Sequence, residues 1–297
     1  MTDHPALTFG DRTLAVADLI EIGRLSGTWP AFVVATQAGL ALDRDVPAED
    51  LRAAATAFRY ERGLLAAADF RRWLDEARLT SADLAGVLRR TLLRERHAWP
   101  DAEPDIEPVL WAELICTGTM ATLVREATDR LAAWHNLKGP GPFNFAELEE
   151  ALRAFAARVA DADEVERRLA QHRIDWLRVT GDEATFAHEG AAREARLLVR
   201  EGEPLADVAR LAGVAATARE RLIEVAPPVV AGKLAAAVPG ELVGPWEQEG
   251  EWRLVVVTAK TPPRAEDAEL RERATRELLD EALARLSAGQ VRRHVPV

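Results

Sequence analysis

Two neighbouring stretches decide the fold of this chain: LLVREGEPLADVARLAGV at residues 197–214 and PGELVGPWEQEGEWRLVVVTAKTPP at residues 239–263. In the first, apolar residues recur at helical spacing on both sides of Gly202, which predicts two short helices over 193–210 joined at that glycine. In the second, β-prone residues at 243–248 and 252–259 flank Glu249-Gly250-Glu251, where the glycine can take a positive φ. This stretch therefore predicts a β-hairpin.

Together these stretches resemble the second half of a parvulin-type peptidyl-prolyl isomerase domain. In that family a helix with a glycine and a Leu-Ala-like pair precedes a hairpin that contains Gly-Pro. The matching positions here are Gly202, Leu205-Ala206, Gly244-Pro245 and Trp252-Arg253-Leu254-Val255. The resemblance covers residues 175–262 and implies a small α/β domain with a peptide groove.

The chain departs from the parvulin pattern at the residues that would perform isomerase chemistry. The hairpin histidine of active parvulins falls on Arg253, and the first-strand histidine is expected near 175–178, where none occurs. Residues 219–223 hold the place of a glycine-rich segment. The resemblance thus implies a retained fold whose catalytic groove is degenerate.

Composition narrows the class of protein. The 297 residues are enough for two domains, and the alanine- and leucine-rich hydrophobic share of 48% favours helices. The net charge of −11 argues against nucleic-acid or anionic-membrane partners. A single cysteine and an N-terminus without a basic segment followed by an apolar core lead us to expect a cytoplasmic protein.

The rest of the chain reads as helical. Short helices are expected over 5–100, a stiff Pro-rich connector over 100–108, one long helix over 109–137, and helices over 144–173 that lead into a strand at 174–180. A leucine-striped helix over 267–286 must bury its stripe, either by returning to the N-terminal region or by forming a homodimer.

We therefore predict a mostly helical α+β protein. Its expected parts are a helical, chaperone-like domain at 1–173 (blocks 1–99 and 109–173), a parvulin-like α/β domain at 174–262, and a C-terminal helix at 263–297 that returns to the N-terminal region.

The candidate peptide-binding residues are Trp176, Arg178, Trp246, Trp252 and Arg253. Trp246 and Trp252 are expected to lie nearly opposite each other across the hairpin, with Trp176 opening the adjacent strand. Indoles gathered on one sheet face would give an extended peptide an apolar floor beside a free strand edge. In the competing interpretation, the same indoles seal the sheet against its helices.

Cys116 is the other residue with reactive chemistry. With His97 or His135 it would form a nucleophile and base pair, but its setting among Leu114, Ile115 and Met120 favours a small buried hydrophobe. The six histidines are scattered, with none at i, i+3 or i, i+4, and no nucleotide-binding or zinc motif occurs. We expect no metal and no cofactor.

The first functional hypothesis comes from the resemblance, which is nearest to parvulin-related proteins of bacterial peptide-maturation systems. It is a peptide-binding maturation factor or chaperone that acts on a ribosomally made precursor peptide, with peptide-modifying enzymes as further partners. The second is an active peptidyl-prolyl isomerase, since an apolar groove that favours the twisted amide lowers the isomerisation barrier. The third is a peptide-modifying or hydrolytic enzyme with Cys116, His135 or an acidic pair at a domain junction.

Overall fold

In a computed structural model that describes residues 3–296, the chain forms two compact units. The first unit runs as far as Ala156 and resumes at Glu281, and the second runs from Ala157 to Asp280. The domain boundaries expected at 173 and 262 both fall inside the second unit. The elements are mostly helices with two small antiparallel sheets, which is the predicted mostly helical α+β class. In the described residues, no helix is both long and apolar enough to cross a membrane.

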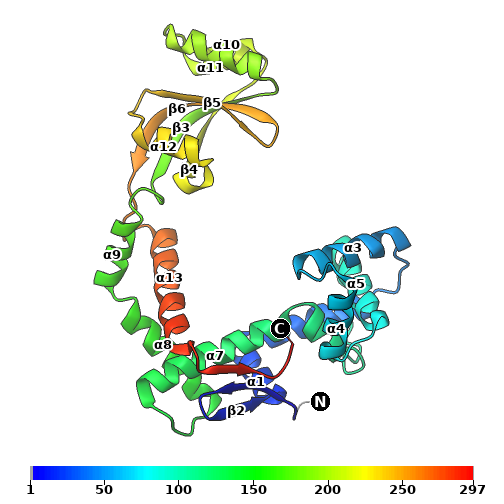
Figure 1. The fold of residues 1–297 in the computed structure, drawn as a ribbon. Coiled ribbons are helices and arrows are strands. Elements are labelled where there is room, and N and C mark those ends of the chain that lie inside the picture. The colour runs from blue at the N-terminus through cyan, green and yellow to red at the C-terminus, as the bar shows by residue number, and fades with distance from the viewer. Residues whose placement is uncertain (1–2, 297) are drawn as a thin grey trace. The chain divides into compact units, whose positions relative to one another are not determined.

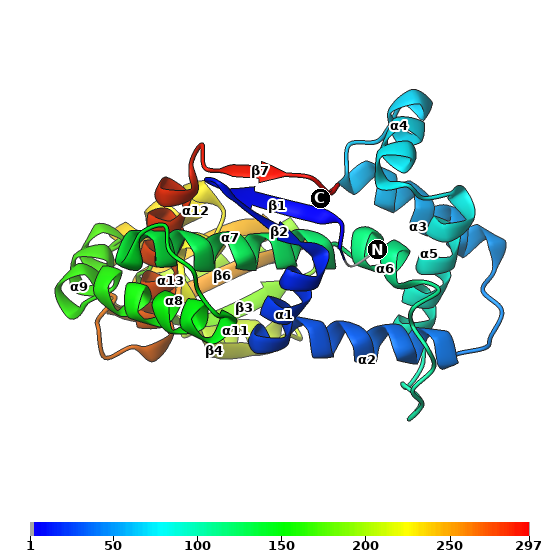
Figure 2. The same cartoon turned by 90° about the horizontal axis from the view of Figure 1, so that it is seen from below.

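The first unit contains a three-stranded sheet with the order β2-β1-β7, built from β1 (Pro5–Phe9), β2 (Arg12–Ala15) and β7 (Val291–Arg293). Figure 2 shows β7, in red, beside β1, in blue. The prediction of helices from residue 5 was wrong here. Strands this short show almost no period, and β7, which completes the sheet, comes from the far end of the sequence.

Helices make up the rest of the first unit. Their bounds are α1 (Val16–Ser26), α2 (Thr28–Ala41), α3 (Ala48–Glu61), α4 (Ala67–Ala77), α5 (Ser81–Arg96), α6 (Leu110–Cys116), α7 (Thr119–Lys138) and α8 (Phe145–Val159). The predicted cap of α5 is confirmed, because the Thr80 hydroxyl accepts from Asp83 N and Asp83 Oδ2 accepts from Thr80 N.

The long helix predicted over 109–137 is two helices. Gly118 has a φ of +77°, a left-handed conformation that ends α6 and precedes α7. Apolar residues recur at helical spacing on both sides of this glycine. Periodicity alone does not reveal a change of helix axis.

The second unit is built on a four-stranded antiparallel sheet with the order β4-β3-β6-β5. Its strands are β3 (Arg178–Phe186), β4 (Ala216–Leu222), β5 (Leu242–Gln248) and β6 (Glu251–Thr261). Its helices are α9 (Ala162–Gln171), α10 (Glu189–Arg200), α11 (Leu205–Leu211), the 3₁₀ turn η1 (Ile223–Val225), α12 (Pro228–Ala236) and the greater part of α13 (Ala268–Ser287), which continues past Asp280. Figure 1 shows α10 and α11 on one side of this sheet and α12 on the other. We call these two sides the α10 face and the α12 face.

The secondary structure predicted for residues 197–214 and 239–263 is confirmed. The predicted helix pair is α10 and α11, with Gly202 at a φ of +110° between them. The predicted hairpin is β5 and β6, and its two turn residues, Glu249 and Gly250, both have positive φ. Two such residues are what a tight hairpin turn requires.

The strand expected at 174–180 begins later, at Arg178. Trp176 N donates to His172 O (2.9 Å), so residues 172–176 form a turn that continues from α9. Trp176 is buried there, its ring stacked on that of His172 with centroids 4.3 Å apart, and it packs against α9 and α13. The prediction that Trp176 opens the strand beside the hairpin was therefore wrong.

Part of the leucine stripe of α13 packs within the second unit. Leu270, Ala274 and Leu278 pack with Val165 and Leu169 of α9 and with Trp176. The chain then continues through β7, which pairs with β1. The prediction was that the C-terminal helix itself returns to the N-terminal region; the contact that the structure shows is the pairing of β7 with β1, and three residues of the α13 stripe pack within the second unit.

Candidate functional site

The two hairpin tryptophans lie on opposite faces of the sheet, which corrects the prediction that they share one. Trp246 is opposite Arg253, whereas Trp252 is opposite Glu247. The register shifts between Val243 and Trp246, at Gly244-Pro245, and this bulge sets which way Trp246 points. Trp246 packs in the core of the α12 face, and Trp252 packs against that of the α10 face. The indoles therefore help to seal the sheet against its helices on both sides.

A buried carboxylate lies beside Trp246 on the α12 face. Glu183 of β3 is 2% exposed and forms ion pairs with Arg221 of β4 and with Arg253 of β6 (3.5 Å). The Arg221 guanidinium also lies over the Trp246 ring, 5.9 Å from its centroid. We call Glu183, Arg221, Arg253 and Trp246 the Glu183 cluster. All four strands of the sheet contribute to it, so it exists only once the sheet has formed.

In the Glu183 cluster two arginine side chains are paired with one buried carboxylate, and all three groups are largely shielded from water. Burial, followed by repulsion from Arg253, lowers the pKa of Arg221 from its ordinary value. Trp246 Nε1, Gln248 Oε1 and Arg253 Nε are buried without a hydrogen bond to any described residue. Such groups are costly to bury. The ion pairs of the cluster can therefore hold β3, β4 and β6 in register, and the cluster contains no cysteine, serine or histidine.

Across residues 174–262, all of which the structure describes, His188 is the only histidine and there is no cysteine. His188 is the N-cap residue of α10 and is exposed. Arg253, where the resemblance places a histidine, is engaged with Glu183. In this part of the chain the strands therefore supply no imidazole, the group whose ordinary pKa lies near neutral pH.

Arg178 and Trp176 belong to a different place in the second unit. Arg178 forms ion pairs with Asp267 (2.9 Å), Glu269 (2.5 Å) and Glu220 (3.3 Å). Its hydrogen bonds with Glu269 and Asp267 raise its pKa above the ordinary value. Its donors are therefore already occupied by the chain's own carboxylates. Among the five sequence candidates, the structure brings together only Trp246 and Arg253.

Sequence reasoning missed Glu183 and Arg221. Glu183 directly precedes Ala184-Thr185-Phe186, so an acidic residue inside a β-prone run was the available signal. The parvulin resemblance identifies Arg221 only as part of the segment that replaces a glycine-rich one. Their pairing joins two strands whose register the sequence did not define.

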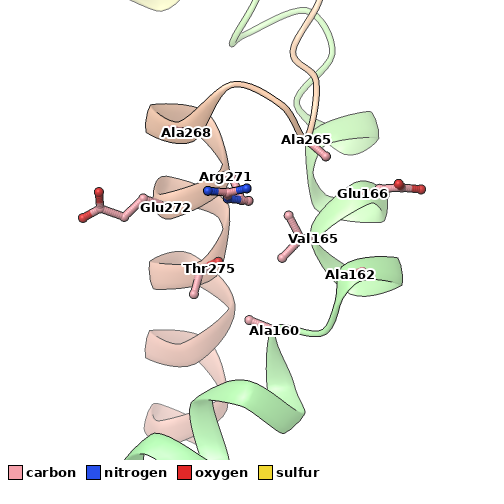
Figure 3. A pocket seen from close by; sticks show the side chains of 9 residues that line it. All are labelled: Ala160, Ala162, Val165, Glu166, Ala265, Ala268, Arg271, Glu272 and Thr275. Carbon is pink, nitrogen blue, oxygen red and sulfur yellow. The ribbon is translucent and has the colours of Figure 1, made fainter.

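A separate pocket of about 590 Å³ lies between α9 and α13. Figure 3 shows the two helices facing each other across it, with Val165 directed into the space and Glu166 directed away. Most of its lining is small or apolar, from residues Ala160, Ala162, Val165, Ala265, Ala268 and Thr275, with Glu166, Arg271 and Glu272 around them. The pocket has room for an apolar side chain, and no sequence motif marked it.

Cys116 has the features of a buried hydrophobe. It is 6% exposed at the end of α6, and burial raises the pKa of its thiol to about 12. His135 lies near the other end of α7, about 24 Å along the helix axis from Thr119. The proposed pairing of Cys116 with His135 is therefore wrong. In the described residues, no group of three or more His, Cys, Asp or Glu side chains is arranged to hold a metal ion.

No family model matches the chain, and no curated protein matches it. Among solved structures, PrsA from Bacillus subtilis is similar at 10% identity and a TM-score of 0.24, over 97% of this chain and 93% of that one. A structure from work on PEB4 and Cj1289, two SurA-like chaperones of Campylobacter jejuni, is similar at 9% identity and a TM-score of 0.21, over 95% and 92% of the two chains. TM-scores this low do not establish a shared fold.

Proposed function

We propose that this chain is a chaperone-like, peptide-binding maturation factor whose parvulin-like unit binds an extended peptide without isomerising it. The observation that carries the proposal is the ion pair between Arg253 and the buried carboxylate of Glu183. A side chain committed to that pair replaces the histidine that the parvulin resemblance would place in a catalytic groove. The sheet is therefore suited to holding a peptide more than to changing it.

Exposed apolar surface in the second unit supports binding. Val225, Val229 and Val238 are 65%, 74% and 62% exposed, and they lie in η1, in α12 and just after α12. Lys233 is the only charged residue of α12. Apolar side chains exposed in one region are typical of surfaces that contact other polypeptides.

The proposed ligand is a ribosomally made precursor peptide, with peptide-modifying enzymes as further partners, in the cytoplasm. These parts of the proposal derive from the resemblance to parvulin-related proteins of peptide-maturation systems. The alternative of an active isomerase needs only an apolar groove, and the experiment below separates the two.

The test combines three measurements on one purified sample: proline cis–trans exchange in a reporter peptide by NMR, the mass of a candidate precursor after incubation, and its binding by fluorescence anisotropy. Binding without faster exchange or a mass change would support the proposal. Accelerated exchange would favour the isomerase, and a mass change would favour an enzyme.

Variants on exposed valines connect binding to the second unit. Val229→Ser should weaken binding, because it removes apolar surface from α12 without disturbing the core. Val34→Ser is the matched control, since Val34 is 54% exposed on α2 of the first unit. Equal loss in both variants, or in neither, would contradict a binding surface at α12.

A further inference from the structure

We infer that the free edge of β4 is the place where an extended peptide joins the sheet, and that it selects a peptide with an acidic residue opposite Arg219. This inference rests on the proposed peptide-binding function and names the docking edge and the chemistry of the ligand. Three observations support it: β4 is an outer strand of the sheet, some of its backbone groups point away from β3, and one of its charged side chains has no ion pair.

The sheet has two outer strands, β4 and β5, and they differ as docking edges. β5 contains Pro245, which has no N–H, and its pairing is interrupted by the bulge between Val243 and Trp246. Proline and bulges are the features that block strand addition at an edge. β4 pairs with β3 over seven consecutive positions without a register shift and contains no proline. β4 is therefore the edge suited to strand addition.

The hydrogen-bond phase of β4 identifies the backbone groups that face outward. Ile223 N donates to Leu177 O (2.9 Å), so this opposed pair is hydrogen-bonded. Hydrogen-bonded and non-hydrogen-bonded pairs alternate along an antiparallel ladder. Ala218 and Glu220 therefore direct their N–H and C=O groups away from β3. Both residues are exposed, so a peptide strand can reach these groups.

The charges on β4 indicate which peptide fits. Glu220 is paired with Arg178, and Arg221 with Glu183. Arg219 is exposed and has no ion pair with any described residue, so the edge presents one unbalanced positive charge. Side chains directly opposite on neighbouring strands lie about 5 Å apart and attract when their charges differ. An acidic residue opposite Arg219 would complete the pairing along this strand.

The test uses two labelled peptides of alternating threonine and valine, one with a central glutamate and its twin with a central lysine. Fluorescence anisotropy should show the glutamate peptide binding about fivefold more tightly to the wild-type chain. Arg219→Glu should reverse this preference. Arg200→Glu, at an exposed position of α10, is the matched charge-reversal control and should leave the preference unchanged.

Ala218→Pro tests the backbone contribution. It removes an outward N–H while all inward ladder bonds remain, so the affinity for both peptides should fall by about tenfold or more with the circular dichroism spectrum unchanged. If the peptides bind and neither Ala218→Pro nor Arg219→Glu changes their affinities, the inference is wrong and the charged edge only prevents aggregation. If no peptide binds the wild-type chain, the proposed function fails, and the inference fails with it.

Discussion

Trp246 lies directly opposite Arg253 across the β5–β6 hairpin, while Trp252, the neighbour of Arg253 in sequence, lies opposite Glu247 on the other face. This relationship depends on the bulge between Val243 and Trp246. Because of this register, the Trp246 indole lies beside the Glu183–Arg253 ion pair on the α12 face. The Trp252 indole packs against the core of the α10 face.

The first prediction concerns Gly244, the glycine of that bulge. Its φ is +114°, and a Cβ there would lie 2.6 Å from Arg253 O. Gly244→Ala should therefore lower the free energy of unfolding by about 2 kcal/mol or more, as measured by urea denaturation. The control is Gly240→Ala, since Gly240 also has a positive φ (+91°) but has open space around it. Equal losses in the two variants would mean that the clash at Arg253 O contributes nothing.

The second prediction concerns the buried carboxylate. Glu183→Ala leaves Arg221 and Arg253 without their shared partner in a partly dehydrated site, so we expect a loss of about 3 kcal/mol. Tryptophan fluorescence during denaturation should report it, because Trp246 belongs to the same cluster. Glu220→Ala removes a carboxylate that is half exposed in its ion pair and should cost less than about 1 kcal/mol. A small loss for Glu183→Ala would contradict a structural role for the cluster.

The third prediction separates Arg178 from peptide binding. Its guanidinium connects β3 to the start of α13 through Asp267 and Glu269. Arg178→Ala should lower stability by about 1–2 kcal/mol and leave the affinity for an uncharged threonine–valine peptide unchanged in the folded protein. An uncharged peptide is needed because the variant also frees Glu220 on β4. Arg178→Lys should recover only part of the stability, because an ammonium cannot bind two carboxylates in the same forked geometry. Weaker peptide binding by a fully folded Arg178→Ala variant would restore Arg178 as a contact residue.

The fourth prediction is a pH dependence that arises from Cys116. Its pKa is about 12 in the folded chain against an ordinary value of 9.0, so the thiol ionises more readily when the chain is unfolded. The resulting stabilisation is complete below pH 9 and is lost as the pH rises from there toward 12, with a limiting slope of about 1.4 kcal/mol per pH unit. Comparison with Cys116→Ala isolates this effect from other titrating groups.

A chemical measurement checks the same residue. The native chain should react with a thiol reagent far more slowly at neutral pH than the urea-unfolded chain, because burial limits both access and ionisation. Rapid labelling of the native chain would contradict this prediction and restore Cys116 as a candidate nucleophile.

Local patterns in the sequence were sufficient for the elements with strong short-range signals. The helix pair around Gly202, the hairpin closed at Glu249-Gly250 and the Thr80 cap all depend on residues within a few positions of one another, and each was predicted. The strands of the first unit were missed because each is short, and because β7, which completes their sheet, comes from the far end of the chain. The start of β3 was misplaced because Trp176 and Ile174 are β-prone residues that lie in a turn.

By itself the sequence determined the mostly helical α+β class, the helix pair, the hairpin and the absence of histidine and cysteine from the hairpin, since composition and local periodicity are sufficient for these. Only the tertiary structure decided which sheet face each tryptophan occupies, that Glu183 joins Arg221 to Arg253, and that β4 leaves one edge free. The physical reason is that side chains alternate between the two faces of a strand, so a single bulge reverses their direction. Ion pairs between strands depend on that register, which long-range pairing alone defines.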